Sequence, residues 1–294
     1  TWLCTANRPA TAPAVDVVVE YEANLLSTLR QDQPDVLAQR ILKRLAEGPV
    51  RFIGVDTSAV SAQLVLRFAD VAASVDPLLW RLRRRKDGDE LTLMRCAVRA
   101  CAAMYERARG LIEPGVDELT VFSELSRVAV RTLGEPMSAP LGNDFACGAR
   151  GGPPRANRPA RAGELYILDL GPAYRGYFAD NARVFCVGGR PTDAQLRAWE
   201  ALRGLFATVE RIARPGIRCI EIVRTIDEQL RGDIGAGVEH HLGHGVGLQP
   251  HEFPHLNPRW DDTREEGDVF TFEPGVYSAD LAAGLRLENQ YLVT

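Results

Sequence analysis

Short runs of aliphatic and β-branched residues alternate with one helical pattern over the first part of the chain. The strand-like runs are residues 15–19 and 51–55, and between them a helical pattern of apolar positions covers residues 25–46, interrupted at Pro34. These elements predict a small α/β domain over residues 1–85.

A longer amphipathic pattern opens the second part and predicts a helix over residues 89–111. Two similar Pro-Gly turns then occur between helical stretches, and their glycines, Gly115 and Gly216, lie 101 positions apart. We therefore expect an α+β domain over residues 86–294 that is built from two similar halves.

Each turn is followed by a pair of strand-like segments that carry acidic residues in apolar surroundings. The segments are residues 165–171, 177–187, 269–277 and 285–293. The first pair carries Asp169 and Asp180, and the second carries Glu273 and Glu288. Equivalent acids lie 104 and 108 positions apart, close to the offset between the turns. This spacing predicts an internal pseudo-twofold repeat in which each half supplies two carboxylates.

Carboxylates on apolar strands lose several kcal/mol of hydration unless a cation compensates them. Two divalent metal ions held by shared carboxylates would balance the charge of all four acids and bring them together. For any single acid, the alternative is that it faces solvent or pairs with an arginine such as Arg183 or Arg286.

All five histidines of the chain lie between residues 240 and 255. His240, His244 and His251 stand in a glycine-rich segment, where the small residues let imidazoles and backbone approach one site. Their spacing differs from the His-Glu-x-x-His motif of zincin helices. The sequence also lacks the P-loop motif and the Gly-x-Ser-x-Gly nucleophile elbow, which argues against those two enzyme classes.

The composition indicates the class of protein, its possible partners and its cellular location. The 294 residues are 46% hydrophobic and 25% charged, which is the balance of a globular protein. A net charge of −4 gives no general attraction to nucleic acid or to anionic membranes, and we expect the basic run at residues 81–86 to be a solvated interdomain segment. Six scattered cysteines without paired spacing predict reduced thiols and a cytoplasmic location.

Taken in order, five motifs of the second part resemble the creatinase, prolidase and methionine aminopeptidase superfamily, specifically its Xaa-Pro peptidase branch. The motifs are Leu168-Asp-Leu-Gly171, Gly176-Tyr-Phe-Ala-Asp-Asn-Ala-Arg183, the segment from His240 to Glu252, Phe272-Glu-Pro-Gly-Val-Tyr277 and Gly284-Leu-Arg-Leu-Glu-Asn289. The resemblance implies a pita-bread fold for residues 86–294 and a small creatinase-like domain before it.

The same resemblance implies two divalent metal ions per chain, with manganese favoured and zinc or cobalt as alternatives. The implied metal ligands are Asp169, Asp180, His244, Glu273 and Glu288. Asp180 and Glu288 would bridge the two ions. Glu273 would also transfer a proton, and His251 would donate a hydrogen bond to the developing oxyanion.

The implied activity is hydrolysis of the bond between an N-terminal residue and proline, by a homodimer that acts on small peptides with proline at the second position. We expect His240 and Arg286 on the substrate side, with pairing of Arg286 to the ligand carboxylates as the alternative. Two other functions stay open: a different metal-dependent hydrolytic or lytic activity, and a protein-binding role with weak or no peptidase activity.

One departure from the family pattern concerns the substrate side. Active peptidases of this family carry a further histidine shortly before the first ligand aspartate, whereas residues 148–157 contain none. Ala182 also stands where threonine is usual. We expect Arg150 or Arg155 to bind a substrate carboxylate in place of the histidine, which would favour dipeptides.

Overall fold

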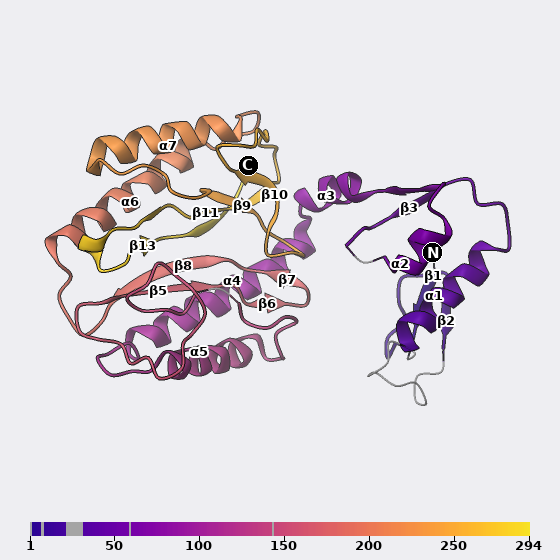
Figure 1. Cartoon of the computed structure of the whole chain (residues 1–294), viewed down its shortest axis with the longest axis horizontal. Coiled ribbons are helices and arrows are strands. Elements are labelled where there is room, and N and C mark those ends of the chain that lie inside the picture. Colours follow the sequence, from indigo (N-terminus) through magenta and orange to yellow (C-terminus); the bar gives the residue numbers. More distant parts are fainter. Residues whose placement is uncertain (1, 7–8, 22–31, 59, 143) are drawn as a thin grey trace. The chain divides into compact units, whose positions relative to one another are not determined.

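The computed structural model describes residues 2–6, 9–21, 32–58, 60–142 and 144–294 (Figure 1). The chain divides into two compact units, Thr1–Leu79 and Trp80–Thr294. The division falls within helix α3 (Asp76–Arg84), somewhat ahead of residue 85, where the sequence placed the boundary. No helix of the described residues is both long and apolar enough to cross a membrane.

In its described residues, the first unit contains two parallel strand pairs, two helices and the beginning of α3. The strand pairs and the two helices are β1 (Trp2–Thr5) with β2 (Val17–Glu20), β3 (Ile53–Val55) with β4 (Ala72–Ser74), α1 (Asp32–Leu45) and α2 (Ala62–Arg67). Residues 25–31 of the predicted helix lie outside the described residues. Pro34 lies in the first turn of α1, where its missing N–H breaks no intrahelical hydrogen bond.

The second unit places strands between two pairs of helices (Figure 1). The helices are α4 (Gly88–Arg109), α5 (Glu118–Leu133), α6 (Asp193–Ile212), α7 (Cys219–Ile234) and the short η1 (Ala279–Leu281). The strands are β5 (Leu165–Leu170), β6 (Ala173–Tyr174), β7 (Tyr177–Phe178), β8 (Asn181–Cys186), β9 (Gly243–Gly245), β10 (Glu252–Leu256), β11 (Val269–Phe272), β12 (Gly275–Val276), β13 (Leu285–Arg286) and β14 (Asn289–Leu292). Helix α4 packs on α5, and α6 packs on α7.

Helix α4 confirms the predicted helix over residues 89–111. Its N-terminus is fixed by a capping box, in which the Asp87 side chain accepts from the backbone N–H of Glu90 and the Glu90 side chain accepts from that of Asp87. Ala97, Met104 and Ala108 share one buried face of the helix. The apolar pattern of the sequence is therefore the face that packs inward.

Two large apolar cores hold the second unit together, beside a small cluster of Met94, Val246 and Val269. One lies among α6, α7 and strands β11 to β13, where Leu205, Ile222 and Phe272 are fully buried. The other lies among α4, α5 and β5, where Met104 and Leu168 are fully buried. Each helix pair thus has its own core, and the strands between the two cores carry the polar residues described below.

Three of the four predicted strands are broken, and each break lies at an acidic residue. Only β5, which carries Asp169, runs without interruption, and it pairs antiparallel with β8. Asp180 separates β7 from β8, Glu273 separates β11 from β12, and Glu288 separates β13 from β14. At all three breaks the backbone N–H of the acid bonds outside the paired strands: that of Asp180 donates to the Gln290 side chain over 3.1 Å, that of Glu273 to the Leu242 carbonyl over 2.9 Å, and that of Glu288 to the Ala182 carbonyl over 3.0 Å. The backbone of each of these acids is therefore held by contacts outside its own strand.

Candidate metal centre

The five residues predicted as metal ligands come together within the second unit. They are Asp169, Asp180, His244, Glu273 and Glu288, and each is at most 7% exposed. Three overlapping groups have ligand atoms within 4.8 Å of one another: Asp180 with His244 and His251, His244 with Glu273 and Glu288, and Asp169 with Asp180 and Glu288. Segments far apart in the sequence thus supply one buried cluster.

Glu288 is the most completely enclosed of the four carboxylates. It is 1% exposed, and neither of its carboxylate oxygens has a hydrogen-bond partner among the described residues. Burial, reinforced by the nearby charges of Asp180 and Asp169, raises the pKa of Glu288 well above its ordinary value. An ionised carboxylate in this position needs a cation to compensate it.

Asp180 and Asp169 are also buried carboxylates, but different charges surround them. Burial raises the pKa of Asp180 well above its ordinary value, and the adjacent charges of Asp169 and Glu273 add to the effect. Burial also raises the pKa of Asp169, although the charge of Arg286 opposes the rise. The Arg286 Nε donates to Asp169 Oδ2 over 3.0 Å. One arginine thus compensates part of the negative charge of the cluster.

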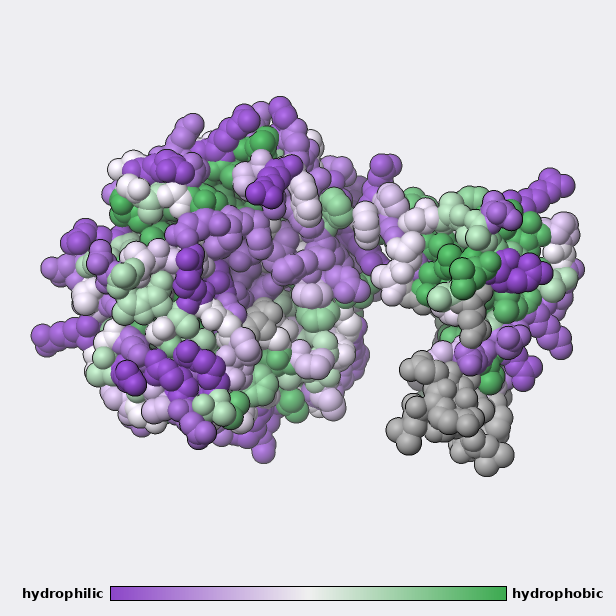
Figure 2. All heavy atoms as spheres, viewed as in Figure 1, coloured by the Kyte–Doolittle hydropathy of each residue, from purple (hydrophilic) through white to green (hydrophobic). Residues whose placement is uncertain are grey.

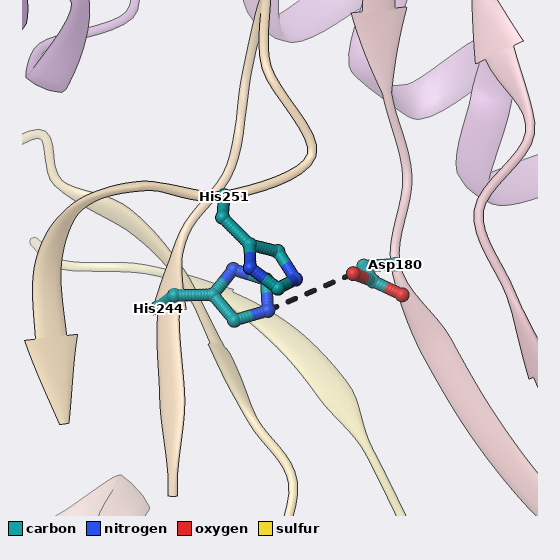
Figure 3. A group of neighbouring side chains, drawn as sticks. All are labelled: Asp180, His244 and His251. Atoms are coloured by element: carbon teal, nitrogen blue, oxygen red, sulfur yellow. Dashed lines mark ion pairs between the residues drawn. The ribbon is translucent and has the colours of Figure 1, made fainter. Parts of the chain in front are cut away.

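His244 presents one ring nitrogen to this cluster. Its Nδ1 lies 2.9 Å from the Gly245 carbonyl oxygen, an arrangement in which Nδ1 carries the proton and donates it. Nε2 then has a free lone pair and lies 3.7 Å from Asp180 Oδ2 (Figure 3). The same atom lies 3.4 Å from Glu273 Oε1. This is the tautomer that a metal-ligating histidine adopts.

The glycines beside His244 let its strand approach neighbouring backbone. A Cβ at Gly243 would collide with the carbonyl of Thr271, and one at Gly245 would collide with the carbonyl of Phe253. Gly243 also has a φ of 147°, which side chains rarely adopt. The Gly-His-Gly sequence is therefore required by the packing of β9 between β10 and β11.

Glu273 lies between two imidazoles. Its Oε1 is 3.4 Å from His244 Nε2 and 3.4 Å from His241 Nδ1, and it has no hydrogen-bond partner among the described residues. Burial acts to raise the pKa of Glu273, but the contact with His244 and the nearby His241 and His240 lower it overall. The sequence prediction did not include His241, although its place in the histidine-rich segment was the signal that could have found it.

His251 packs directly on His244. The two ring centroids are 3.9 Å apart with an interplanar angle of 35°, and Figure 3 shows both rings beside Asp180. Burial of the ring, together with His244, lowers the pKa of His251 to about 4. A neutral imidazole at physiological pH carries one N–H that can donate a hydrogen bond.

His240, Tyr277 and Arg286 form a hydrogen-bonded group beside the cluster. The His240 Nε2 lies 3.0 Å from the Tyr277 hydroxyl, to which Arg286 Nη1 donates over 3.2 Å. Arg286 also bonds to Asp169 and Asp144, so its guanidinium pairs with a predicted ligand as well as facing the cavity. Tyr277 and Asp144 are contacts that the sequence prediction missed.

Residues 148–157, which lack the family histidine, contain the two arginines that we expected to replace it. The two arginines have different surroundings. Arg155 makes two side-chain hydrogen bonds to the buried Glu118, over 3.0 and 2.6 Å, so its predicted contact with substrate is wrong. Arg150 instead lines the cavity beside the cluster. The family histidine is expected about 17 residues before the first ligand aspartate, and Gly152 occupies that position here; its N–H donates to the Asp144 side chain over 2.6 Å.

A cavity of about 430 Å³ opens onto these groups. It is lined by His240, His241, His244 and His251 together with acidic residues and two arginines. In Figure 2 hydrophilic residues gather between the two helix layers of this unit. The cavity is large enough for a small peptide and has a strongly polar wall.

The cluster fits a divalent metal. Four carboxylates and one imidazole form an oxygen-rich set that suits hard or borderline cations. Three of the carboxylate oxygens, both of Glu288 and one of Glu273, are buried without hydrogen-bond partners among the described residues. The tautomer of His244 and the high pKa values of Asp180 and Glu288 are consistent with the same assignment.

Comparison with known proteins identifies a family and several relatives of this chain. The sequence model of metallopeptidase family M24 matches residues 92–294. The uncharacterized peptidase YqhT of Bacillus subtilis (strain 168) is 28% identical over 228 residues, which are 76% of this chain and 62% of that protein. The chain therefore spans less than two thirds of the length of this relative.

Solved structures show the same fold. A prolidase from Pyrococcus furiosus superposes with a TM-score of 0.77 at 22% identity, over 95% of this chain and 79% of its own. An Xaa-Pro dipeptidase from Bacillus anthracis superposes with a TM-score of 0.79 at 22% identity, over 95% of this chain and 76% of its own. The second unit accordingly has the pita-bread fold with mixed α and β content, as the sequence predicted.

Proposed function

The chain belongs to metallopeptidase family M24, and from this premise we propose that it hydrolyses the peptide bond between an N-terminal residue and proline. The observation that carries the proposal is the buried carboxylate of Glu288, whose two oxygens lack partners among the described residues within a group of five ligand-type side chains. The cavity beside this group offers room for a small peptide.

In the proposed site, Asp169, Asp180, His244, Glu273 and Glu288 would hold two divalent ions, with manganese as the first choice. Such ions lower the pKa of water and polarise a peptide carbonyl. The side chains of the protein supply the other functions. Glu273 Oε1, which is free of hydrogen bonds within the described part of the chain, would accept a proton and return it to the leaving nitrogen.

His251 would donate a hydrogen bond from its neutral ring to the oxygen that becomes negative during the reaction. His240, Tyr277 and Arg286 would orient the peptide, because their mutual hydrogen bonds fix three polar side chains at the wall of the cavity. Arg286 in addition neutralises part of the charge of Asp169.

We also propose that the second unit contains an internal repeat. Gly115 N donates to the Ala160 carbonyl over 2.8 Å, and Gly216 N donates to the Arg264 carbonyl over the same distance. Both glycines have a positive φ, 93° and 88°. The creatinase-like nature of residues 1–85, the homodimer and the cytoplasmic location stay predictions.

An assay of short peptides with manganese tests the proposed activity. We expect release of alanine from Ala-Pro or Ala-Pro-Ala, none from Ala-Ala, and loss of activity with a chelator. Equal hydrolysis of Ala-Ala would contradict the proline specificity. Failure to hydrolyse any of the peptides at saturating manganese would contradict the peptidase and favour the protein-binding role.

A further inference from the structure

The two arginines of the cavity have different surroundings. Arg286 is 9% exposed and bonds to Asp169, Asp144 and Tyr277, so its guanidinium is already engaged. The side chain of Arg150 is 62% exposed. Among the described residues, Arg150 makes a single hydrogen bond, from Nη2 to the Glu239 carboxylate. Most of its N–H groups are therefore available to a ligand.

Arg150 is nevertheless held in a defined place. Its Cζ lies 4.4 Å from the centre of the Tyr277 ring, which is the stacked arrangement that arginine adopts on an aromatic face. The Tyr277 hydroxyl is bonded to His240 and Arg286 at the cavity wall. Tyr277 thus connects the guanidinium of Arg150 to the group that faces the substrate.

The charges around the cavity restrict where a substrate carboxylate can bind. The acidic residues of its lining are Asp144, Asp169, Asp180, Glu239 and Glu273. Bound metal would compensate Asp169, Asp180 and Glu273, and Arg286 pairs with Asp144, so Glu239 is the acid that competes with a substrate carboxylate beside Arg150. Arginine binds carboxylates through a planar, two-pronged set of donors. A dipeptide ending in proline places its carboxylate one residue from the scissile bond, whereas a longer peptide has a neutral amide there.

We propose that Arg150 binds the C-terminal carboxylate of the substrate and so selects dipeptides, while Glu239 competes with that carboxylate for the same guanidinium. This inference rests on the proposed function. It predicts opposite effects for the two partners: removal of Arg150 weakens binding of the peptide acid, and neutralisation of Glu239 strengthens it. The corresponding peptide amide responds little to either change.

The test compares KM for Ala-Pro and for Ala-Pro amide in the manganese-loaded protein. We expect Arg150→Ala to raise KM for Ala-Pro about tenfold with kcat within about twofold, since a hydrogen bond to a charged group is lost. Glu239→Gln should lower KM for Ala-Pro. The control is Arg161→Ala. Arg161 is an exposed arginine of the segment between α5 and β5, which also carries Arg150, and it is not part of the cavity lining. This variant should leave KM and kcat for Ala-Pro unchanged. An unchanged KM for Ala-Pro in Arg150→Ala would overturn the inference and leave the proposed function standing.

Calorimetry with metal-free protein gives a second measurement that needs no turnover. We expect the wild type to bind Ala-Pro more tightly than Ala-Pro amide, and Arg150→Ala to lose this difference. Equal binding of acid and amide by the wild type, or binding of neither, would overturn the inference. Loss of all hydrolysis with the calorimetric difference retained would contradict the peptidase activity and leave Arg150 as a carboxylate-binding residue.

Discussion

Replacing Glu288 with glutamine should change thermal stability in opposite directions with and without metal. In the metal-free protein, Glu288 is a buried carboxylate whose oxygens lack partners among the described residues, which costs about 1–3 kcal/mol. Above the raised pKa of Glu288, Glu288→Gln removes a buried charge; below that pKa the side chain is already neutral, and the substitution should change Tm little. A free-energy change of 1 kcal/mol shifts Tm by about 2–4 °C in a domain of roughly 150–250 residues, which is the size range of the second unit, Trp80–Thr294. In the pH range where Glu288 is ionised, Tm should therefore rise by about 4 °C.

Manganese should reverse the order of the two proteins. At a concentration of 100 times Kd, a bound ion adds about 2.7 kcal/mol to the stability of the wild type, or about 8 °C in Tm, and the variant should gain little of this. Differential scanning calorimetry in chelator and in manganese measures both effects. Glu266→Gln, at an exposed position, is the matched control.

The pH dependence of the metal-free protein follows from the same charges. Burial raises the pKa values of Glu288 and Asp180, so the folded state binds more protons than the unfolded state. Their stabilising contribution is complete below the unfolded pKa values and is lost as pH rises through the folded ones. The metal-free wild type should therefore have a lower Tm near about pH 7.5 than near about pH 5.5. This difference in Tm should be smaller in Glu288→Gln. A lower Tm of the variant in chelator would refute this reasoning.

Three further variants separate chemistry from stability. His251→Ala should keep its bound metal but lower kcat by roughly 100-fold, as measured by metal analysis and steady-state kinetics, because the lost donor acts mainly in the transition state. Lys86→Met should lower the free energy of unfolding by about 3–5 kcal/mol, as measured in denaturant titrations. The Lys86 ammonium lies 2.9 Å from the buried Glu252 carboxylate, which would lose its cation. Lys86→Met combined with Glu252→Gln should recover much of the loss. Arg155→Ala should lower Tm through its lost bonds to Glu118 while KM for Ala-Pro stays constant.

The candidate cluster could be predicted because each acid stands among apolar neighbours and the histidines are concentrated in one segment. Asp169 and Glu288, for example, are buried as their flanking residues suggested. Their assignment as metal ligands stays a prediction. The sequence could not show that Asp180, Glu273 and Glu288 interrupt their strands, because hydrophobic alternation carries no information on where a ladder stops.

Contacts between distant segments account for the rest of what the sequence missed. Asp144 bonds to Arg286 across 142 positions, and neither residue belongs to a pattern that marks the other. The sequence does not distinguish Arg150 from Arg155, because both are arginines of the same glycine- and proline-rich segment. Only the fold places the buried Glu118 of α5 beside Arg155 and leaves Arg150 at the cavity.

Metal stoichiometry tests the central claim most directly. The purified protein would be saturated with manganese, dialysed and examined by plasma mass spectrometry, with Glu288→Gln and the exposed control Glu266→Gln treated in parallel. The account predicts about two ions per chain in the wild type and the control, and markedly fewer in Glu288→Gln, because a neutral amide replaces a shared carboxylate. A wild type that retains no manganese, or a Glu288→Gln variant that retains as much as the wild type, would contradict it.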